Sequence, residues 1–250
     1  MNRVPGRRGV PRSQRGQALV ESVLVLPLAI FMILGTVQLF MMMQARMMAQ
    51  YAAYKAVRAG SLNSGSCSAM LQAAGAAVLP TFARTDNADL FFKAYKARFN
   101  GDHLSYNVAY DGLDAPLVEI VREQPLLANI PAPEDLDFDD PTIPHLAGTL
   151  EISMVYWYHL RIPFADWVMT RIFLAYSNLY PPPANNPLLV VQQSTNWSGP
   201  GTLGAGSQGT RMRDWANAGH YMFPIPVSAV MRMMTPAARA YFQNQGCPTP

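Results

Sequence analysis

Residues 16–60 read GQALVESVLVLPLAIFMILGTVQLFMMMQARMMAQYAAYKAVRAG and decide the fold class. No charged residue occurs from Ser22 to Ala45. The polar side chains that interrupt this run are Ser22, Thr36, Gln38 and Gln44. A hydrocarbon core about 30 Å thick requires about 20 apolar residues in a helix, and a helix satisfies its own backbone hydrogen bonds in lipid. The stretch therefore predicts one transmembrane helix embedded in a lipid bilayer.

The segment before this helix is basic. Residues 1–16 contain no acid, and their basic residues are Arg3, Arg7, Arg8, Arg12 and Arg15. Because positive flanks stay in the cytoplasm, we expect a cytoplasmic N-terminus and an outer domain beyond residue 45. A secretory signal peptide is excluded, because its apolar core is about 7–15 residues long and ends at a small-residue cleavage site.

Glu21 stands at the head of the apolar run, where a lone carboxylate is costly unless it has a partner. With the basic leader and Gly16, it resembles the type IV prepilin signature. The resemblance implies cleavage by a prepilin peptidase between Gly16 and Gln17, which would make Glu21 the fifth residue of the mature chain. Glu21 would then meet the N-terminal amine of a neighbouring subunit, since two buried opposite charges cost less together than alone.

Residues 15–28, RGQALVESVLVLPL, followed by residues 44–61, QARMMAQYAAYKAVRAGS, resemble the TadE-like family of tight-adherence pilus assembly proteins. Members of this family are small pseudopilin-like membrane proteins. The matching positions are Gly16, Gln17, Ala18, Glu21, Pro27, Arg46, Ala52, Ala53, Ala56, Arg58 and Ala59. The resemblance implies other pilus or pseudopilin subunits and assembly proteins as partners. It also implies that a bend at Pro27 is shared with pilin-like subunits, although one tolerated kink explains the residue equally well.

Length and charge bound the rest of the chain. With 250 residues, we expect a leader at 1–16, a transmembrane helix with its extension at 17–60, and one outer domain at 61–250. The net charge of +3 belongs to the leader, because removing its five arginines leaves 14 basic against 16 acidic residues. A basic patch for phosphate binding is therefore missing, and nucleic acid is excluded as a partner.

The cysteines Cys67 and Cys247 lie at opposite ends of the outer domain. In an oxidising compartment they either form a disulfide, which would tie the C-terminus to the base of the long helix, or remain two free thiols.

The predicted fold is α+β. An N-terminal transmembrane helix extends into a long helix, and an extracytoplasmic domain with a small antiparallel sheet and several helices follows. The alanines from Ala45 to Ala59 favour a helix that continues to Arg58 and is ended by the turn-forming residues 60–66. Their small side chains suit either contact with other membrane helices or packing on the protein's own domain.

Later elements follow from periodicity and from proline and glycine positions. Helices are expected over 68–79, 86–99, 164–174 and 236–244, with a helical turn over 211–218. Strands are expected over 103–111 and 149–160, paired antiparallel with each other, and a short strand over 188–192. The segments 116–123 and 228–234 stay ambiguous, while 125–144 and 194–210 are expected to be loops.

No motif predicts catalysis or a cofactor. Residues 204–209 match G-x-G-x-x-G, but no strand precedes them, so we interpret them as a flexible loop. The acids between 134 and 140 lack the spacing and the glycine of a calcium loop, and no histidine has a second ligand at metal spacing. Together with this lack of motifs, the resemblance implies a non-enzymatic TadE-like pseudopilin or minor pilin without cofactor or metal. It would act in assembly of a tight-adherence pilus or secretion apparatus through helix packing and protein contacts. The alternative is a membrane-anchored extracytoplasmic enzyme or ligand-binding domain that uses the helix only as a tether.

Overall fold

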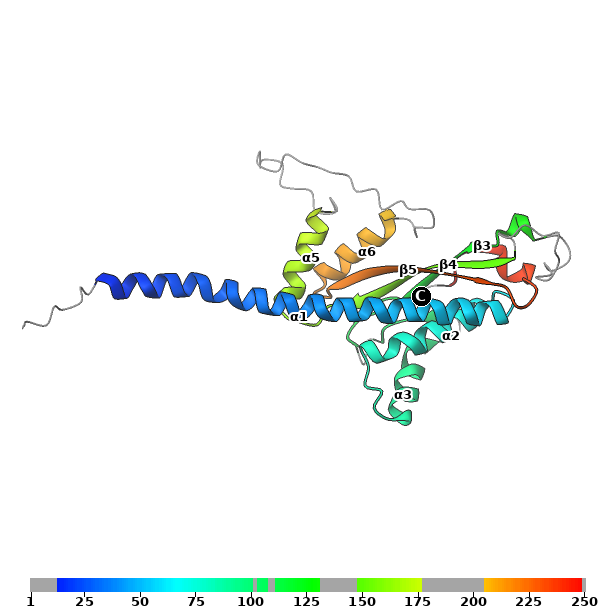
Figure 1. The fold of residues 1–250 in the computed structure, drawn as a ribbon, viewed down its shortest axis with the longest axis horizontal. Coiled ribbons are helices and arrows are strands. Elements are labelled where there is room, and N and C mark those ends of the chain that lie inside the picture. Colours follow the sequence, from blue (N-terminus) through cyan, green and yellow to red (C-terminus); the bar gives the residue numbers. More distant parts are fainter. Residues whose placement is uncertain (1–12, 101–102, 108–110, 131–147, 177–204, 249–250) are drawn as a thin grey trace, which may run out of the picture.

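A single helix, α1, runs lengthwise through the molecule, and its N-terminal part projects beyond the rest (Figure 1). The computed structural model describes residues 13–100, 103–107, 111–130, 148–176 and 205–248. Helix α1 spans Ser13–Leu62 and continues through Pro27. The predicted long helix is confirmed, and it ends at Leu62, four residues beyond the predicted end at Arg58. Just after this end, Asn63 and Gly65 donate their backbone N–H groups to the Gly60 carbonyl.

Two further helices follow as predicted. Helix α2 spans Cys67–Val78 and continues into the short 3₁₀ helix η1, Leu79–Thr81. Helix α3 spans Ala88–Arg98. It begins at Asn87, whose side chain accepts a hydrogen bond from the Asp89 backbone N–H, as expected of an N-terminal cap.

A three-stranded antiparallel sheet forms the centre of the outer domain. Strands β3 (Val118–Gln124), β4 (Thr149–His159) and β5 (Met222–Arg232) lie in the order β3-β4-β5. The α+β prediction is thereby confirmed, and both ambiguous segments belong to strands. Pro224 and Pro226 fit within β5 because it is an edge strand, where a missing N–H group is tolerated.

Helices cover both faces of this sheet. Helix α1 contacts β4, whose fully buried side chains include Leu150, Ile152, Met154 and Tyr156. On the opposite face, Trp157 packs edge-to-face on Trp215 of α6 (Ala205–Asn217). Helix α5 (Ala165–Tyr176) lies next to α6 and contacts β5 through Phe173 and Phe223, whose ring centroids are 5.0 Å apart. The apolar run of β4 thus reflects burial on two sides.

The strand predicted over 103–111 is wrong in extent and in partner. The structure has two-residue strands, β1 (Phe99–Asn100) and β2 (His103–Leu104), which pair with each other. Both edges of β4 are occupied by β3 and β5, so no edge remains for residues 103–107. The alternation in this segment reflects the burial of Leu104 and Tyr106 in the core.

Two other predictions need correction. The loop predicted over 194–210 is wrong from Ala205 onward, because α6 begins there and buries Met212 and Ala216, so that packing overrides the poor helix propensity of its glycines. The helix predicted over 236–244 is the short 3₁₀ helix η3, Arg239–Gln243. The strand predicted over 188–192 and most of the loop predicted over 125–144 lie outside the described residues.

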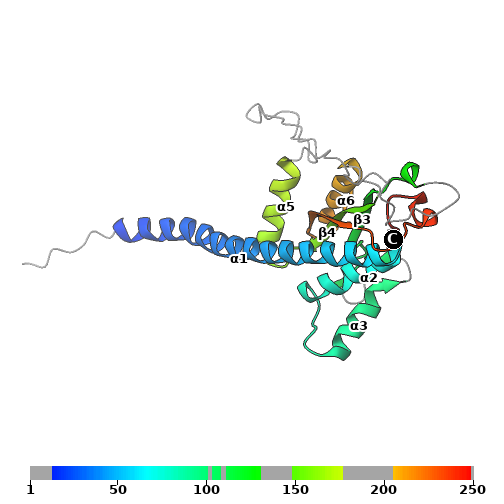
Figure 2. The same ribbon diagram turned by 45° about the vertical axis from the view of Figure 1, so that its right-hand side comes forward.

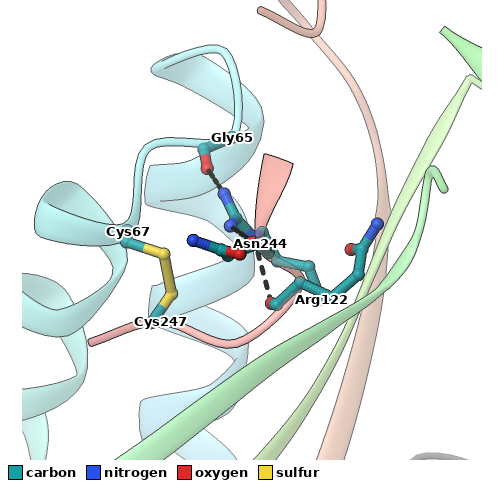
Figure 3. The surroundings of a disulfide bond; sticks show 6 residues. Gly65, Cys67, Arg122, Asn244 and Cys247 are labelled. Carbon is teal, nitrogen blue, oxygen red and sulfur yellow. Dashed lines mark hydrogen bonds between the residues drawn. A yellow bond between two sulfur atoms is a disulfide. The ribbon is translucent and has the colours of Figure 1, made fainter. Parts of the chain in front are cut away.

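The C-terminal segment returns to the end of α1. The Cys247 sulfur is bonded to that of Cys67, with Cα atoms 5.4 Å apart and a sequence separation of 180. Beside this disulfide, buried Arg122 of β3 donates hydrogen bonds to the backbone carbonyls of Gly65, Asn244 and Gln245 (Figure 3). We call the group Gly65, Cys67, Arg122, Phe242, Asn244, Gln245 and Cys247 the C-terminal clasp.

Gly65 is required at the centre of this clasp. Its φ of +83° is one that other residues rarely adopt, and a Cβ atom there would lie 2.4 Å from the Phe242 ring. The Arg122 guanidinium in turn lies over the Phe242 ring, with its Cζ atom 4.8 Å from the ring centroid. The turn after α1, the sheet and the chain end are therefore joined at one point.

Removing the disulfide is expected to lower the free energy of unfolding by about 5 kcal/mol, because the closed loop is long and its closure entropy is correspondingly large. Thermal unfolding of the full chain in detergent, followed by circular dichroism, measures this for the Cys67→Ser/Cys247→Ser variant. Reductant should destabilise the wild type and leave the variant unchanged. Equal stability of the two proteins without reductant would contradict the prediction.

Candidate functional site

The part of α1 that projects from the outer domain has an apolar, exposed surface. Exposed large side chains on this part include Val23, Val25, Leu26, Leu28, Ile30, Met32, Ile33 and Val37. The helix from Glu21 to Leu62 is long enough and apolar enough to contain a membrane span. Exposing so much apolar surface to water is unfavourable, so this part of α1 is suited to single-pass membrane anchoring.

Glu21 is the acidic residue of this exposed part. It is exposed, and among the side chains that the structure describes no basic group forms an ion pair with it. A carboxylate near the end of a span costs free energy unless a cation neutralises it. The predicted role of Glu21 in assembly stays a prediction.

The other predicted processing and assembly positions are also in α1. Gly16 and Gln17 lie near its start, and their cleavage stays a prediction. Pro27 lies inside the helix with its ring exposed, and the bend predicted there also stays a prediction.

Beyond Gln38 one face of α1 becomes part of the outer domain. The buried side chains of this face are small, and they are Ala45, Ala49, Ala52, Ala53, Ala56 and Val57. They allow α1 to approach α2, β4 and β5 closely. Of the two interpretations of the alanine face, packing on the protein's own domain is the one that the structure contains.

The opposite face of the same helix is exposed and largely apolar. We call it the outer stripe of α1, formed by Phe40, Met43, Met47, Tyr51 and Tyr54. These residues recur at three- and four-residue spacing, so they share one side of the helix. Continuous with the projecting part, the outer stripe gives α1 an apolar surface along its length.

Residues 16–58 match the TadE-like family model. The match confirms the resemblance of the N-terminal segment, and it supports a role related to pilus assembly and to structural pilus components. Comparison with curated proteins and with solved structures found no match. The TadE-like segment contains Gly16, Gln17, Glu21, Pro27 and the outer stripe, so the predicted sites and the exposed surface of α1 coincide.

Outside the TadE-like segment, the described residues offer little for catalysis. They contain no cluster of three or more His, Cys, Asp or Glu side chains able to hold a metal ion. His159 is half-buried at the end of β4, and its pKa is lowered first by burial and further by His220 and Arg161. Buried Glu119 pairs with Arg211 of α6, with 2.6 Å between Oε1 and Nη1, which joins that helix to the sheet.

A hollow of about 360 Å³ lies between the TadE-like segment and β5. Its lining is apolar except for Arg46, and consists of Leu39, Met42, Met43, Arg46, Phe223, Pro224, Ile225 and Pro226. Without an acid–base pair or a nucleophile in that lining, the hollow is suited to contact rather than to reaction.

Sequence reasoning missed two residues that matter here. Gln38 was visible as a polar interruption of the apolar run, but not as a buried acceptor for the backbone N–H of Ile162, 3.0 Å away. Arg122 had no signal in the sequence, because its acceptors are carbonyls brought close only by the fold.

Proposed function

We propose that this protein is a TadE-like pseudopilin or minor pilin that acts in assembly of a tight-adherence pilus or a related secretion apparatus. The observation that carries the proposal is the surface of α1. Beyond Gln38, one face of α1 is buried on the protein's own domain. The outer stripe and the projecting part of α1 remain exposed and apolar, and both lie within the residues 16–58 that match the family model.

In this proposal residues 1–16 are a leader removed by a prepilin peptidase, and residues 17–60 form the membrane helix with its extension. Residues 61–250 form a domain outside the cytoplasm. The five leader arginines favour a cytoplasmic N-terminus, and the disulfide suits an oxidising compartment such as the periplasm. The protein is then a single-pass inner-membrane protein whose C-terminal domain is periplasmic or extracellular.

The proposed mechanism is helix packing rather than catalysis. In the bilayer the projecting part of α1 lies beside the membrane helices of other subunits, and Glu21 pairs with the N-terminal amine of a neighbour. Outside the bilayer the outer stripe packs on a partner helix, because burying its methionine and aromatic side chains removes apolar surface from water. The larger, irregular outer domain favours a minor or priming component over a bulk fibre subunit.

The Met47→Glu variant is expected to prevent assembly while leaving the subunit folded. Met47 is 62% exposed, so the subunit alone loses little stability. In the assembly the change removes about 2 kcal/mol of burial per helix contact, or about thirtyfold in association constant. Surface pili sheared from cells and quantified by immunoblot measure the effect.

Leu90→Glu is the matched control, because it places the same charge on an exposed apolar site of α3, away from α1. Normal pilus yield in Leu90→Glu cells and loss in Met47→Glu cells would support the proposal. Normal yield with both variants would reject helix packing through the outer stripe and favour the helix as a mere tether.

A further inference from the structure

Helix α5 presents an exposed, mostly apolar face at the edge of the outer domain. Phe164, Trp167 and Ile172 are 54%, 46% and 62% exposed. With half-buried Val168 and Arg171 they follow one side of the helix. The other side, with Ala165, Thr170 and Leu174, is buried in the domain. The exposed face is therefore one that the protein's own core does not use.

This face points toward the projecting part of α1. Gln38 of α1 is fully buried and holds the segment before α5 by accepting a hydrogen bond from the Ile162 backbone N–H. The Phe164 ring packs edge-to-face on Phe31, which precedes Gln38 in α1, with ring centroids 5.7 Å apart. Phe31 lies about two helical turns nearer the N-terminus than Gln38. The face that includes Phe164 thus looks toward the membrane end of the molecule.

The direction of α5 suits a membrane surface. Figure 1 and Figure 2 both show α5 standing across α1 rather than running along it. Residues 17–38 of α1 span about 33 Å, close to the thickness of a hydrocarbon core of about 30 Å. If α1 crosses the bilayer over these residues, Gln38 lies at its outer boundary and α5 lies in the plane of the surface.

Phe164 breaks a local rule of helix structure. It stands directly before α5, and its carbonyl accepts a hydrogen bond from the Val168 N–H at 3.1 Å, as that of a helix cap does. Caps are usually Ser, Thr, Asp or Asn, whereas Phe164 is a bulky residue with φ of +73°. Bulky residues rarely adopt a positive φ, so Phe164 is held in an unfavourable backbone conformation. The contact recorded for the Phe164 ring is the one with Phe31, and 54% of the residue remains exposed.

We propose that α5 is an interfacial helix that lies on the outer bilayer surface at the level of Gln38 and inserts Phe164, Trp167 and Ile172 among the lipids. Tryptophan is enriched where hydrocarbon meets headgroups, and amphipathic helices bury their apolar face about 5–10 Å into this boundary. This contact fixes the depth of α1 and the orientation of the outer domain. The inference rests on the proposed membrane span of α1.

The test uses the full chain in nanodiscs of phosphatidylethanolamine and phosphatidylglycerol. Both native cysteines are in the disulfide, so a thiol-reactive spin label attaches only to an introduced cysteine. Ile172→Cys reports on α5, while exposed Val25→Cys and Tyr241→Cys report on the span and on the clasp end. Collision rates with oxygen, which favours lipid, and with a water-soluble nickel complex measure the environment of each label.

The label at position 172 is expected to have an oxygen-to-nickel ratio several-fold above that at 241 and below that at 25. Adding Phe164→Asn and Trp167→Gln should lower it to the value at 241. Asparagine tolerates positive φ and caps helices, so this variant keeps the fold, which circular dichroism checks.

Three other results overturn the proposal. A label at 172 as accessible to nickel as that at 241, with the label at 25 still in lipid, would place α5 in water while the span of α1 stands. Exclusion of the label at 172 from both reagents would mean that protein covers the face. If the label at 25 is also in water, the membrane span itself fails, and the inference fails with it.

Discussion

Cells that carry Glu21→Ala are expected to lose pilus assembly. The carboxylate is exposed at the head of the span and has no cationic partner among the described side chains. We therefore expect its partner to be the N-terminal amine that cleavage before Gln17 creates on a neighbouring subunit. Burying an amine whose partner has been removed costs about 3–5 kcal/mol, enough to abolish a specific subunit contact.

Intact mass of the protein purified from membranes, with and without the prepilin peptidase, measures whether that amine exists. A mass that corresponds to a start at Gln17, found only with the peptidase, is expected for wild type and variant alike. The matched control is Gln44→Ala, which alters an exposed polar side chain farther along α1. An uncut chain in both strains, or normal pili with Glu21→Ala, would contradict the proposed charge pair.

Arg122→Ala is expected to lower the free energy of unfolding by about 3–5 kcal/mol. The side chain is 2% exposed. Burial lowers its pKa to about 10, so the guanidinium stays charged at neutral pH and depends on its carbonyl partners. Alanine leaves the Gly65 and Asn244 carbonyls without this donor, at about 1–3 kcal/mol each, and opens a cavity beside Phe242.

Two variants separate these contributions. Arg122→Met retains packing on Phe242 but not the hydrogen bonds, and should recover only the cavity part of the loss. Arg84→Ala removes an exposed arginine, whose ion pair with Asp86 at 3.6 Å is expected to contribute less than about 1 kcal/mol. Guanidinium unfolding of the full chain in detergent measures all three. If Arg122→Ala is no less stable than Arg84→Ala, the clasp has little energetic importance.

Helices and strands were predicted correctly from the sequence where a single local pattern determines the element. The charge-free run gives the long helix, and turn residues bound α2 and α3. The alternating and then continuous apolar residues of 149–160 give β4, because this strand is buried on both faces where α6 covers it. The processing and assembly positions followed from the resemblance, which the family match supports for residues 16–58.

Other features depend on contacts between distant segments. Tyr106 has strand-like spacing, yet it is buried by packing, and its hydroxyl donates to the Trp157 carbonyl. Periodicity reports which side chains are buried but not which strand lies beside them. From the sequence, the residues of the exposed α5 face are visible only as a mixture of apolar and basic side chains. Its significance arises only from its placement against Phe31 and Gln38.

The disulfide also has a mechanical consequence. A pulling force transmitted through α1 leaves the helix at Leu62 and reaches Cys67 five residues later, where the bond to Cys247 closes the intervening chain into a covalent ring. Tension between the membrane and the C-terminus then passes across the sulfur atoms and bypasses the sheet. Under tension applied between these two points, the protein can lengthen only by residues outside the ring, so the sheet within it carries none of that load.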